Sequence, residues 1–231
     1  MLIRIRHTHP RGGAQSGITL VELIIAMSIM GILSAMILMV WFSLQSSYAS
    51  SVQNAKQRDV ARQGVWRMAT EIRDAQGIEG YPPVMSAGAN SILIGTSFNN
   101  SGNSEQPTDA SSPDASVHRV RFFYSEGDRT IYRTEDANGD GNFADETQVA
   151  LVGNVVNGTV PAGSSTSTPL FRYSYYDTSG VLQTVDSLTA GIDPARLLNV
   201  QIQALVDIKP NKSPTYMDLR TTVQPRNAAR H

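Results

Sequence analysis

The fold of this chain is decided by Gly17-Ile-Thr-Leu-Val-Glu-Leu-Ile-Ile-Ala-Met-Ser-Ile-Met-Gly-Ile-Leu-Ser-Ala-Met-Ile-Leu-Met-Val-Trp-Phe42. From Ile18 to Phe42 the only ionisable side chain is that of Glu22. Because a helix rises about 1.5 Å per residue, this run would more than cover a hydrocarbon core of about 30 Å. The sequence therefore predicts a membrane-spanning helix over residues 18–43.

The carboxylate of Glu22 is unusual, because an ionisable side chain inside a membrane span is costly and commonly functional. Two interpretations are open. Glu22 can snorkel to the membrane surface, since the polar leader ends at Gly17. Alternatively, a peptidase that cuts after Gly17 would free an α-amine on Ile18, four residues before Glu22 and on the same face of a helix. The ammonium and the carboxylate would then pair, either within one chain or between neighbouring chains.

The sequence from Gly17 through Ile-Thr-Leu-Val-Glu into a long apolar run resembles the class III leader and first helix of type IV pilins and type II secretion pseudopilins. The resemblance implies that a prepilin peptidase removes residues 1–17 and then N-methylates Ile18. It also implies a role in filament assembly for Glu22. Met39 stands where major pilins usually have a helix-kinking proline, which argues against an abundant major pilin.

Composition limits the function classes. The chain has 231 residues, a formal net charge of -1 and no cysteine. The length suits a membrane helix followed by one globular domain, and the charge does not favour nucleic-acid binding through the whole surface. Disulfides and cysteine-based metal or nucleophile sites are excluded. Positive charge in the leader, from Arg4, Arg6 and Arg11, predicts a cytoplasmic N-terminus and a periplasmic C-terminal bulk.

Apolar residues recur at three- and four-residue steps over residues 44–76, which predicts an amphipathic helix that ends near Gly77. We expect this half of the helix to pack on the C-terminal domain. A dimeric coiled coil is the alternative, although the pattern breaks near Arg58. Trp66 and Met68 are expected in the core.

Beyond the helix the hydrophobic period changes to two, most clearly from Val200 to Ile208. This pattern predicts a β-rich head over residues 77–231, an antiparallel sheet with one buried face covered by the helix of residues 44–76. The expected fold class is therefore α+β, a long N-terminal helix packed on a C-terminal antiparallel head, as in pilins. The expected strands lie at residues 91–95, 119–124, 130–134, 148–152, 170–176, 198–208 and 215–223, and a mobile loop is expected at residues 99–114.

Two segments of the head add to the resemblance. Tyr173-Ser-Tyr-Tyr-Asp-Thr-Ser-Gly and Thr221-Thr-Val-Gln-Pro-Arg-Asn resemble the branch that contains minor pilin W and pseudopilin J.

One loop has the spacing of a calcium site. In Asp136-Ala-Asn-Gly-Asp-Gly-Asn-Phe-Ala-Asp-Glu-Thr147, oxygen-bearing side chains occupy positions one, three, five and seven, and Gly141 occupies position six. This is the first half of an EF-hand loop, but Thr147 replaces the closing glutamate and no flanking helices are expected. An Asx- and Gly-rich turn without metal is the alternative. The candidate Ca²⁺ ligands are Asp136, Asn138, Asp140, Asn142, Asp145 and Glu146.

The sequence holds no recognisable catalytic motif of the nucleophile-elbow, phosphate-loop or paired-histidine type. His118 is expected as a surface histidine on a strand. Basic residues along one predicted hairpin are expected to form a solvated face or a subunit contact rather than a nucleic-acid patch; they are Arg119, Arg121, Arg129 and Arg133.

These features favour a minor pilin without enzymatic activity that helps prime or cap a type IV pilus. A J-type pseudopilin of type II secretion is one alternative, and a single-pass anchored calcium-binding domain outside any filament is another. The expected partners are prepilin peptidase, the major pilin, other minor pilins or pseudopilins, and the bacterial inner membrane. The precursor is expected in that membrane with its head in the periplasm, and the mature form in a pilus or pseudopilus that can reach the cell surface.

Overall fold

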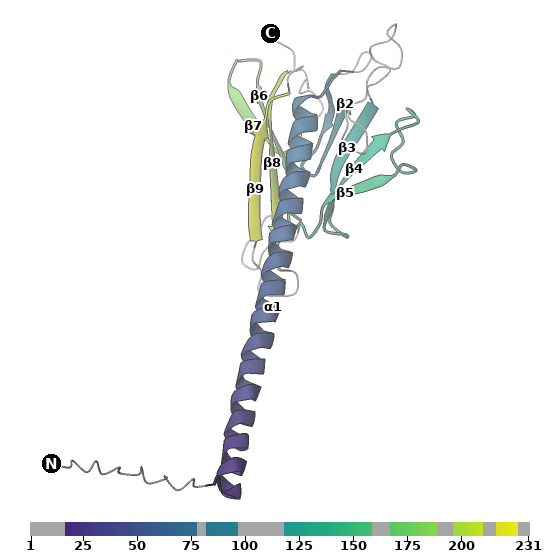
Figure 1. The fold of residues 1–231 in the computed structure, drawn as a ribbon. Coiled ribbons are helices and arrows are strands. Elements are labelled where there is room, and N and C mark those ends of the chain that lie inside the picture. The colour runs from purple at the N-terminus through teal and green to yellow at the C-terminus, as the bar shows by residue number, and fades with distance from the viewer. Residues whose placement is uncertain are drawn as a thin grey trace, which may run out of the picture. The chain divides into compact units, whose positions relative to one another are not determined.

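The computed structural model describes residues 17–77, 82–96, 118–158, 167–188, 196–209 and 216–225. Within these ranges the chain forms helix α1 (Leu20–Arg73) followed by nine strands, labelled in Figure 1. The chain divides into two compact units, the N-terminal unit Met1–Ser51 and the C-terminal unit Val52–His231.

In the N-terminal unit, α1 is apolar on every side. Its large side chains are open to the surroundings, for example Leu23 at 52% and Met39 at 74% exposure. The helix is long and apolar enough to cross a membrane, and the segment from Leu20 to Phe42 would span about 35 Å. A helix that is apolar all round requires an apolar environment, so its surface supports membrane anchoring.

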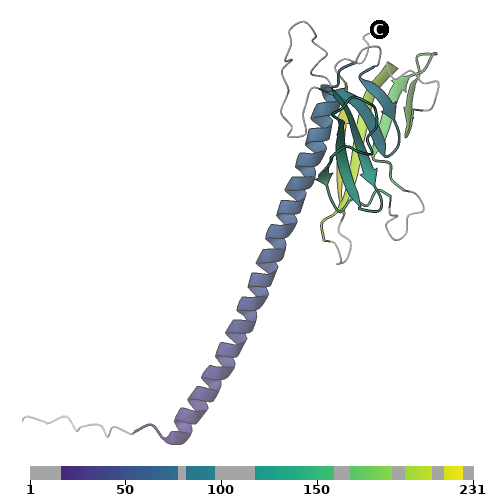
Figure 2. The ribbon, with the colours of Figure 1, turned by 90° about the vertical axis from the view of Figure 1, so that its right-hand side faces the viewer.

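The C-terminal unit contains two antiparallel sheets (Figures 1 and 2). The first has the order β1-β2-β3-β4-β5 and the second the order β7-β6-β8-β9. The strands of the first sheet are β1 (Val84–Ala87), β2 (Ser91–Thr96), β3 (His118–Ser125), β4 (Thr130–Asp136) and β5 (Gln148–Val152). Those of the second are β6 (Phe171–Tyr176), β7 (Leu182–Val185), β8 (Leu197–Asp207) and β9 (Tyr216–Val223).

One apolar core joins both sheets to the end of α1. The helix contributes a stripe that begins at Ala61 and includes Met68 and Ile72, while β3 contributes Phe122 and β8 contributes Ile202. All five side chains are at most 1% exposed. Figure 2 shows this end of α1 against the strands. The α+β architecture and the antiparallel head are therefore confirmed, and the head consists of two sheets rather than one.

Gly64 brings α1 unusually close to the edge strand β5. A Cβ atom at this position would lie 2.5 Å from Cγ2 of Val152 and 2.7 Å from the backbone oxygen of Leu151. Such distances are shorter than van der Waals contact, so the missing side chain of Gly64 sets the helix–strand separation.

Two short strands were not predicted from the sequence. β1 and β7 have four residues each, which is too short for an alternating pattern to stand out. The other seven strands lie where alternation predicts them, within one or two residues at each end. The loop predicted at residues 99–114 lies outside the described residues.

The predictions for the second half of α1 need correction. The helix ends at Arg73 rather than near Gly77, and the amide of Gln76 instead donates to Gly95 O on β2 at 2.9 Å. The packed stripe begins only at Ala61, because Leu44, Tyr48 and Val52 are 63%, 73% and 51% exposed. Trp66 is 70% exposed and was wrongly assigned to the core, whereas Met68 is buried as predicted.

Arg133 is the second correction, because its side chain is fully buried instead of lying on a solvated face. It shares one face of β4 with Ile131, and that face turns toward α1. Its Nε donates to both carboxylate oxygens of Glu71 at 3.2 and 3.0 Å, and Nη1 donates to Glu135 at 2.8 Å. Arg67 adds a third contact to Glu71, from Nε at 2.9 Å. The alternation of β4 thus places the charged side chain of Arg133 in the core, together with its partners Glu71 and Glu135.

Candidate functional site

The junction around Gly17 is open and non-helical. Residues 17–19 precede the first helical residue, Leu20, and Ile18 is 78% exposed. Apart from the two neighbours of Gly17 in the chain, no heavy atom of the described residues lies within 4 Å of a Cβ built at this position. The backbone at the predicted cleavage position is therefore accessible on the described side of the junction.

Thr19 and Glu22 form a reciprocal cap at the start of α1. The amide and the hydroxyl of Thr19 each donate to Oε2 of Glu22 at 2.9 Å, and the amide of Glu22 donates back to the Thr19 hydroxyl oxygen at 3.2 Å. The amide of Leu23 closes the first turn on Thr19 O at 3.1 Å. This is a capping box, which satisfies amides that the first helical turn leaves unpaired.

This geometry changes the expected relation between Ile18 and Glu22. With Thr19 as the capping residue, Ile18 lies one residue before the cap and outside the helix, so the two do not share a helix face in the uncleaved chain. The pairing of a freed Ile18 amine with Glu22 stays a prediction. Sequence reasoning missed Thr19, although Thr-x-x-Glu ahead of an apolar run is the signature of a capping box.

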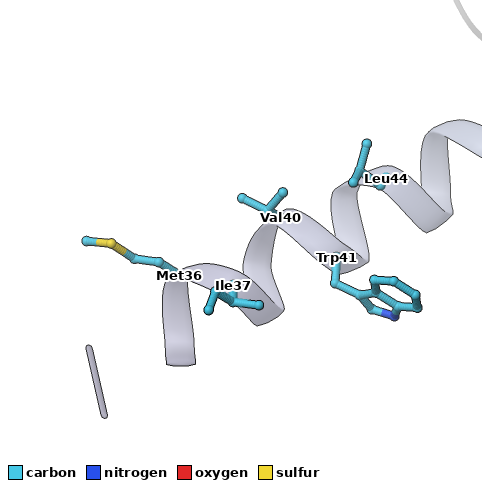
Figure 3. A pocket seen from close by; sticks show the side chains of 5 residues that line it. All are labelled: Met36, Ile37, Val40, Trp41 and Leu44. Carbon is cyan, nitrogen blue, oxygen red and sulfur yellow. The ribbon is translucent and has the colours of Figure 1, made fainter. Parts of the chain in front are cut away.

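A shallow apolar groove lies along α1 inside the N-terminal unit (Figure 3). It is lined by Met36, Ile37, Val40, Trp41 and Leu44, which come from neighbouring turns of the same helix. The lining supplies almost no polar surface with which to orient or activate a substrate. Its chemistry suits packing against lipid chains or another apolar helix.

The predicted calcium loop connects β4 to β5 in the C-terminal unit. Asp136 ends β4 with a fully buried side chain; its Oδ2 accepts a hydrogen bond from the Gly141 amide at 3.0 Å and lies 3.7 Å from Nη1 of Arg119. Gly139 and Gly141 have φ of 76° and 79°, a conformation that glycine adopts without strain.

Most of the remaining oxygen-bearing side chains accept hydrogen bonds from backbone amides of the same loop. Asn138 accepts from the Asp140 amide at 3.0 Å, Asp140 from the Asn142 amide at 2.7 Å, and Asn142 from the Ala144 amide at 3.2 Å. These are successive Asx turns. Glu146 reaches back across the loop, where Oε1 accepts from the amides of Ala137 at 3.1 Å and Asn138 at 3.4 Å. Asp145 is exposed.

The carboxylates of this loop have not converged on one point. Among the described residues, no three or more His, Cys, Asp or Glu side chains are grouped as they would be around a metal ion. The structure thus brings Asp136, Asn138, Asp140, Asn142 and Glu146 into one turn, with the loop amides holding their oxygens. His118 is half-buried at the start of β3, where it pairs with Thr96 of β2.

The family model described as the prokaryotic N-terminal methylation motif matches residues 13–38. The match covers the end of the leader, the junction at Gly17 and the first part of α1. It supports a type IV pilin-like protein, that is, a subunit of the pilin or pseudopilin type, a family that is structural rather than enzymatic. No curated protein sequence matches the chain.

Proposed function

We propose that the mature chain is a minor pilin, a low-abundance structural subunit that helps prime or cap a type IV pilus. One observation carries the proposal: the exposed junction from Gly17 to Glu22 opens a single helix that continues to Arg73. The methylation-motif match covers this junction. Met39 continues the helix at the position where the resemblance to type IV pilins implies a proline in major pilins.

Processing is the first step. Prepilin peptidase would cut the Gly17–Ile18 bond, which lies in open, non-helical backbone. The same enzyme would then methylate the new amine of Ile18. Cleavage removes no group from the capping box, because Thr19 and Glu22 both lie beyond the bond that is cut.

Assembly is the second step. The apolar surface of α1 leaves the lipid for a bundle of similar helices, where Glu22 would be taken out of water. A buried carboxylate without a partner is strongly unfavourable, so it needs a cation at the same depth. The Ile18 ammonium, of the same subunit or a neighbour, supplies that cation while the capping box holds Oε2 of Glu22 at the helix start.

The test is N-terminal peptide mass spectrometry of the protein from sheared filaments and from membranes of the native host. N-methylated Ile18 in the filament fraction is the expected result. An uncut leader, with the protein confined to membranes despite an active prepilin peptidase, would overturn the proposal and favour an anchored domain outside any filament.

Deletion of the gene distinguishes the two filament systems. A minor pilin that primes assembly predicts fewer surface pili in the deletion strain and unchanged type II secretion, with pili restored by the wild-type gene. Lost secretion with normal piliation would instead assign the chain to the J-type pseudopilins.

A further inference from the structure

Asp136 has an unusual environment for an acidic side chain. Oδ2 has the Gly141 amide and the guanidinium of Arg119 nearby, but Oδ1 is buried and has no hydrogen-bond partner within the described structure. Buried carboxylate oxygens are almost always satisfied, and an exception in a folded protein commonly marks a water or an ion. The unsatisfied oxygen therefore points to a ligand.

The bond to Gly141 orients the carboxylate. Gly141 is the sixth residue of the loop, so its hydrogen bond to Oδ2 turns the Asp136 carboxylate toward the loop rather than toward the apolar core. Oδ1 belongs to the same planar carboxylate and is the oxygen without a hydrogen-bond partner. Asn138, Asp140 and Asn142 place their side-chain oxygens around that turn.

A second aspartate turn in the same head provides a comparison. Asp177 follows β6 and begins the turn between β6 and β7, which also contains a glycine of positive φ, Gly180 at 78°. Oδ1 of Asp177 accepts from the amides of Ser179 and Val181, each at 2.9 Å, and Oδ2 accepts from Nε2 of Gln183 at 3.0 Å. This turn satisfies both oxygens of its aspartate, and Asp177 is half-buried. Asp136, in contrast, is buried with one oxygen unsatisfied.

We propose that residues 136–147 bind one Ca²⁺ ion. A hard cation that takes six to eight oxygen ligands accounts for the unsatisfied oxygen of Asp136 and for the alternate spacing of the residues that follow it. The proposed ligands are the side chains of Asp136, Asn138 and Asp140, together with Asn142. A carboxylate of Asp145 or Glu146 closes the site.

Binding requires the carboxylates of the loop to converge on one point. The carboxylate of Glu146 now accepts from two loop amides, so either Glu146 turns inward or the exposed Asp145 does. Arg119 weakens the site because its guanidinium lies 3.7 Å from Oδ2 of Asp136. This proposal does not depend on filament membership.

Calcium at this position would affect the stability of the head. The loop joins β4 to β5, and β5 contacts α1 where Leu151 and Val152 meet Gly64. An ion that binds only the folded state shifts the unfolding equilibrium toward that state by mass action. A free calcium concentration ten times Kd should therefore raise Tm by about 3–5 °C. The expected Kd is on the order of 0.1–1 mM, as in extracellular calcium modules.

The experiment uses the full-length chain in detergent micelles after treatment with a chelator. Calcium binding is measured by isothermal titration calorimetry in the presence of excess Mg²⁺, and Tm is followed in parallel. Asp140→Asn and Glu146→Gln each retain an acceptor oxygen for the loop amides and remove one negative charge. Because the closing carboxylate is Asp145 or Glu146, Asp145→Asn is measured beside Glu146→Gln. Asp177→Asn is the matched control in the comparison turn.

We expect the wild-type chain to bind calcium and Asp140→Asn to weaken the affinity at least tenfold. One of Asp145→Asn and Glu146→Gln should weaken the affinity by the same factor. Asp177→Asn should have an affinity within twofold of wild type. Asp140 is exposed, so its variant should keep the wild-type Tm without calcium. No binding up to 10 mM calcium, about tenfold above the weakest expected Kd, would show that the loop is a metal-free turn. Binding that survives Asp140→Asn and a combined Asp145→Asn/Glu146→Gln variant would place the ion elsewhere and overturn the proposal as well.

Discussion

Arg133 on β4 contacts both carboxylate oxygens of Glu71 on α1 through a single nitrogen, Nε, at 3.0 and 3.2 Å. Neither side chain is more than 2% exposed. The pair joins the end of the helix to an inner strand of the first sheet. Glu135 is the second partner of Arg133, and Arg67 is the second partner of Glu71.

Loss of Arg133 should cost far more stability than loss of the Glu71 charge. Arg133→Met leaves two buried carboxylates with too little positive charge, which should lower the free energy of unfolding by about 3–5 kcal/mol. Glu71→Gln should cost less than half as much, because Arg133 keeps Glu135. Urea unfolding of the full-length chain in detergent measures both.

Arg220 provides the control for this comparison. It pairs with Asp218 on β9 at 2.6 Å, but its side chain is 59% exposed, so Arg220→Met should leave the urea midpoint unchanged. An Arg133→Met variant as stable as wild type would show that the buried network contributes nothing to the head.

The stability of the head should depend on pH in part through the carboxyl of Glu71. Burial raises the pKa of its carboxyl above the usual 4.5, and Arg133 and Arg67 offset only part of that effect. The folded state therefore binds this proton at a higher pH than the unfolded chain. The contribution of Glu71 is fully present below about pH 4.5 and is lost as the pH rises through the folded-state pKa.

Glu71→Gln isolates this effect because glutamine does not titrate. The free energy of unfolding of wild type minus that of the variant should increase as the pH is lowered from 7 to 4. Urea titrations at unit pH intervals measure the difference. A difference that is constant or decreases toward acid pH would contradict the raised pKa.

Gly64 should be a position where a better helix former destabilises the protein. Alanine gains about 1 kcal/mol of helix propensity over glycine, but its Cβ would overlap Val152 and the backbone of Leu151. Overpacking of this kind costs about 1–3 kcal/mol, so Gly64→Ala should lower the urea midpoint. The matched control is Gly31→Ala, because in the described part of the chain no atom other than its chain neighbours and the nearby backbone of its own helix lies within 4 Å of its Cβ. A Gly64→Ala head more stable than wild type would contradict the close approach.

Regular patterns made most of the fold predictable from sequence. Alternation in β8 placed Val200, Ile202 and Ala204 in the core, and the apolar run placed the start of α1 within two residues. The same patterns misplaced Trp66, since one residue moves the side chain about 100° around a helix, from the buried Val65 to the open face.

Contacts between distant segments were beyond such patterns. Glu71 and Arg133 are 62 residues apart, and each alone looks like an ordinary solvated charge. The predicted end of α1 was wrong for the same reason. The amide of Gln76 donates to Gly95 O on β2, so the helix ends before Gly77. In the candidate sites, spacing predicted the loop residues and the resemblance to the class III leader predicted Gly17, and both stay predictions. The burial of Asp136 depends on the folded structure and has no signal in the spacing.

A Thr19 variant separates two roles of Glu22, which are helix capping and charge pairing with the Ile18 ammonium. Thr19 takes part in the capping box but carries no ammonium. Thr19→Val removes the hydroxyl that bonds Glu22 and leaves the carboxylate intact, whereas Glu22→Gln keeps an acceptor oxygen and removes the charge. If charge pairing with Ile18 drives assembly, Glu22→Gln should be nearly absent from sheared filaments while Thr19→Val stays near the wild-type amount. Both variants should reach wild-type levels in the membrane fraction, as measured by quantitative mass spectrometry of head peptides. Equal loss of both variants from filaments would assign Glu22 to helix capping, and a Glu22→Gln variant that assembles normally would remove the carboxylate from the assembly mechanism altogether.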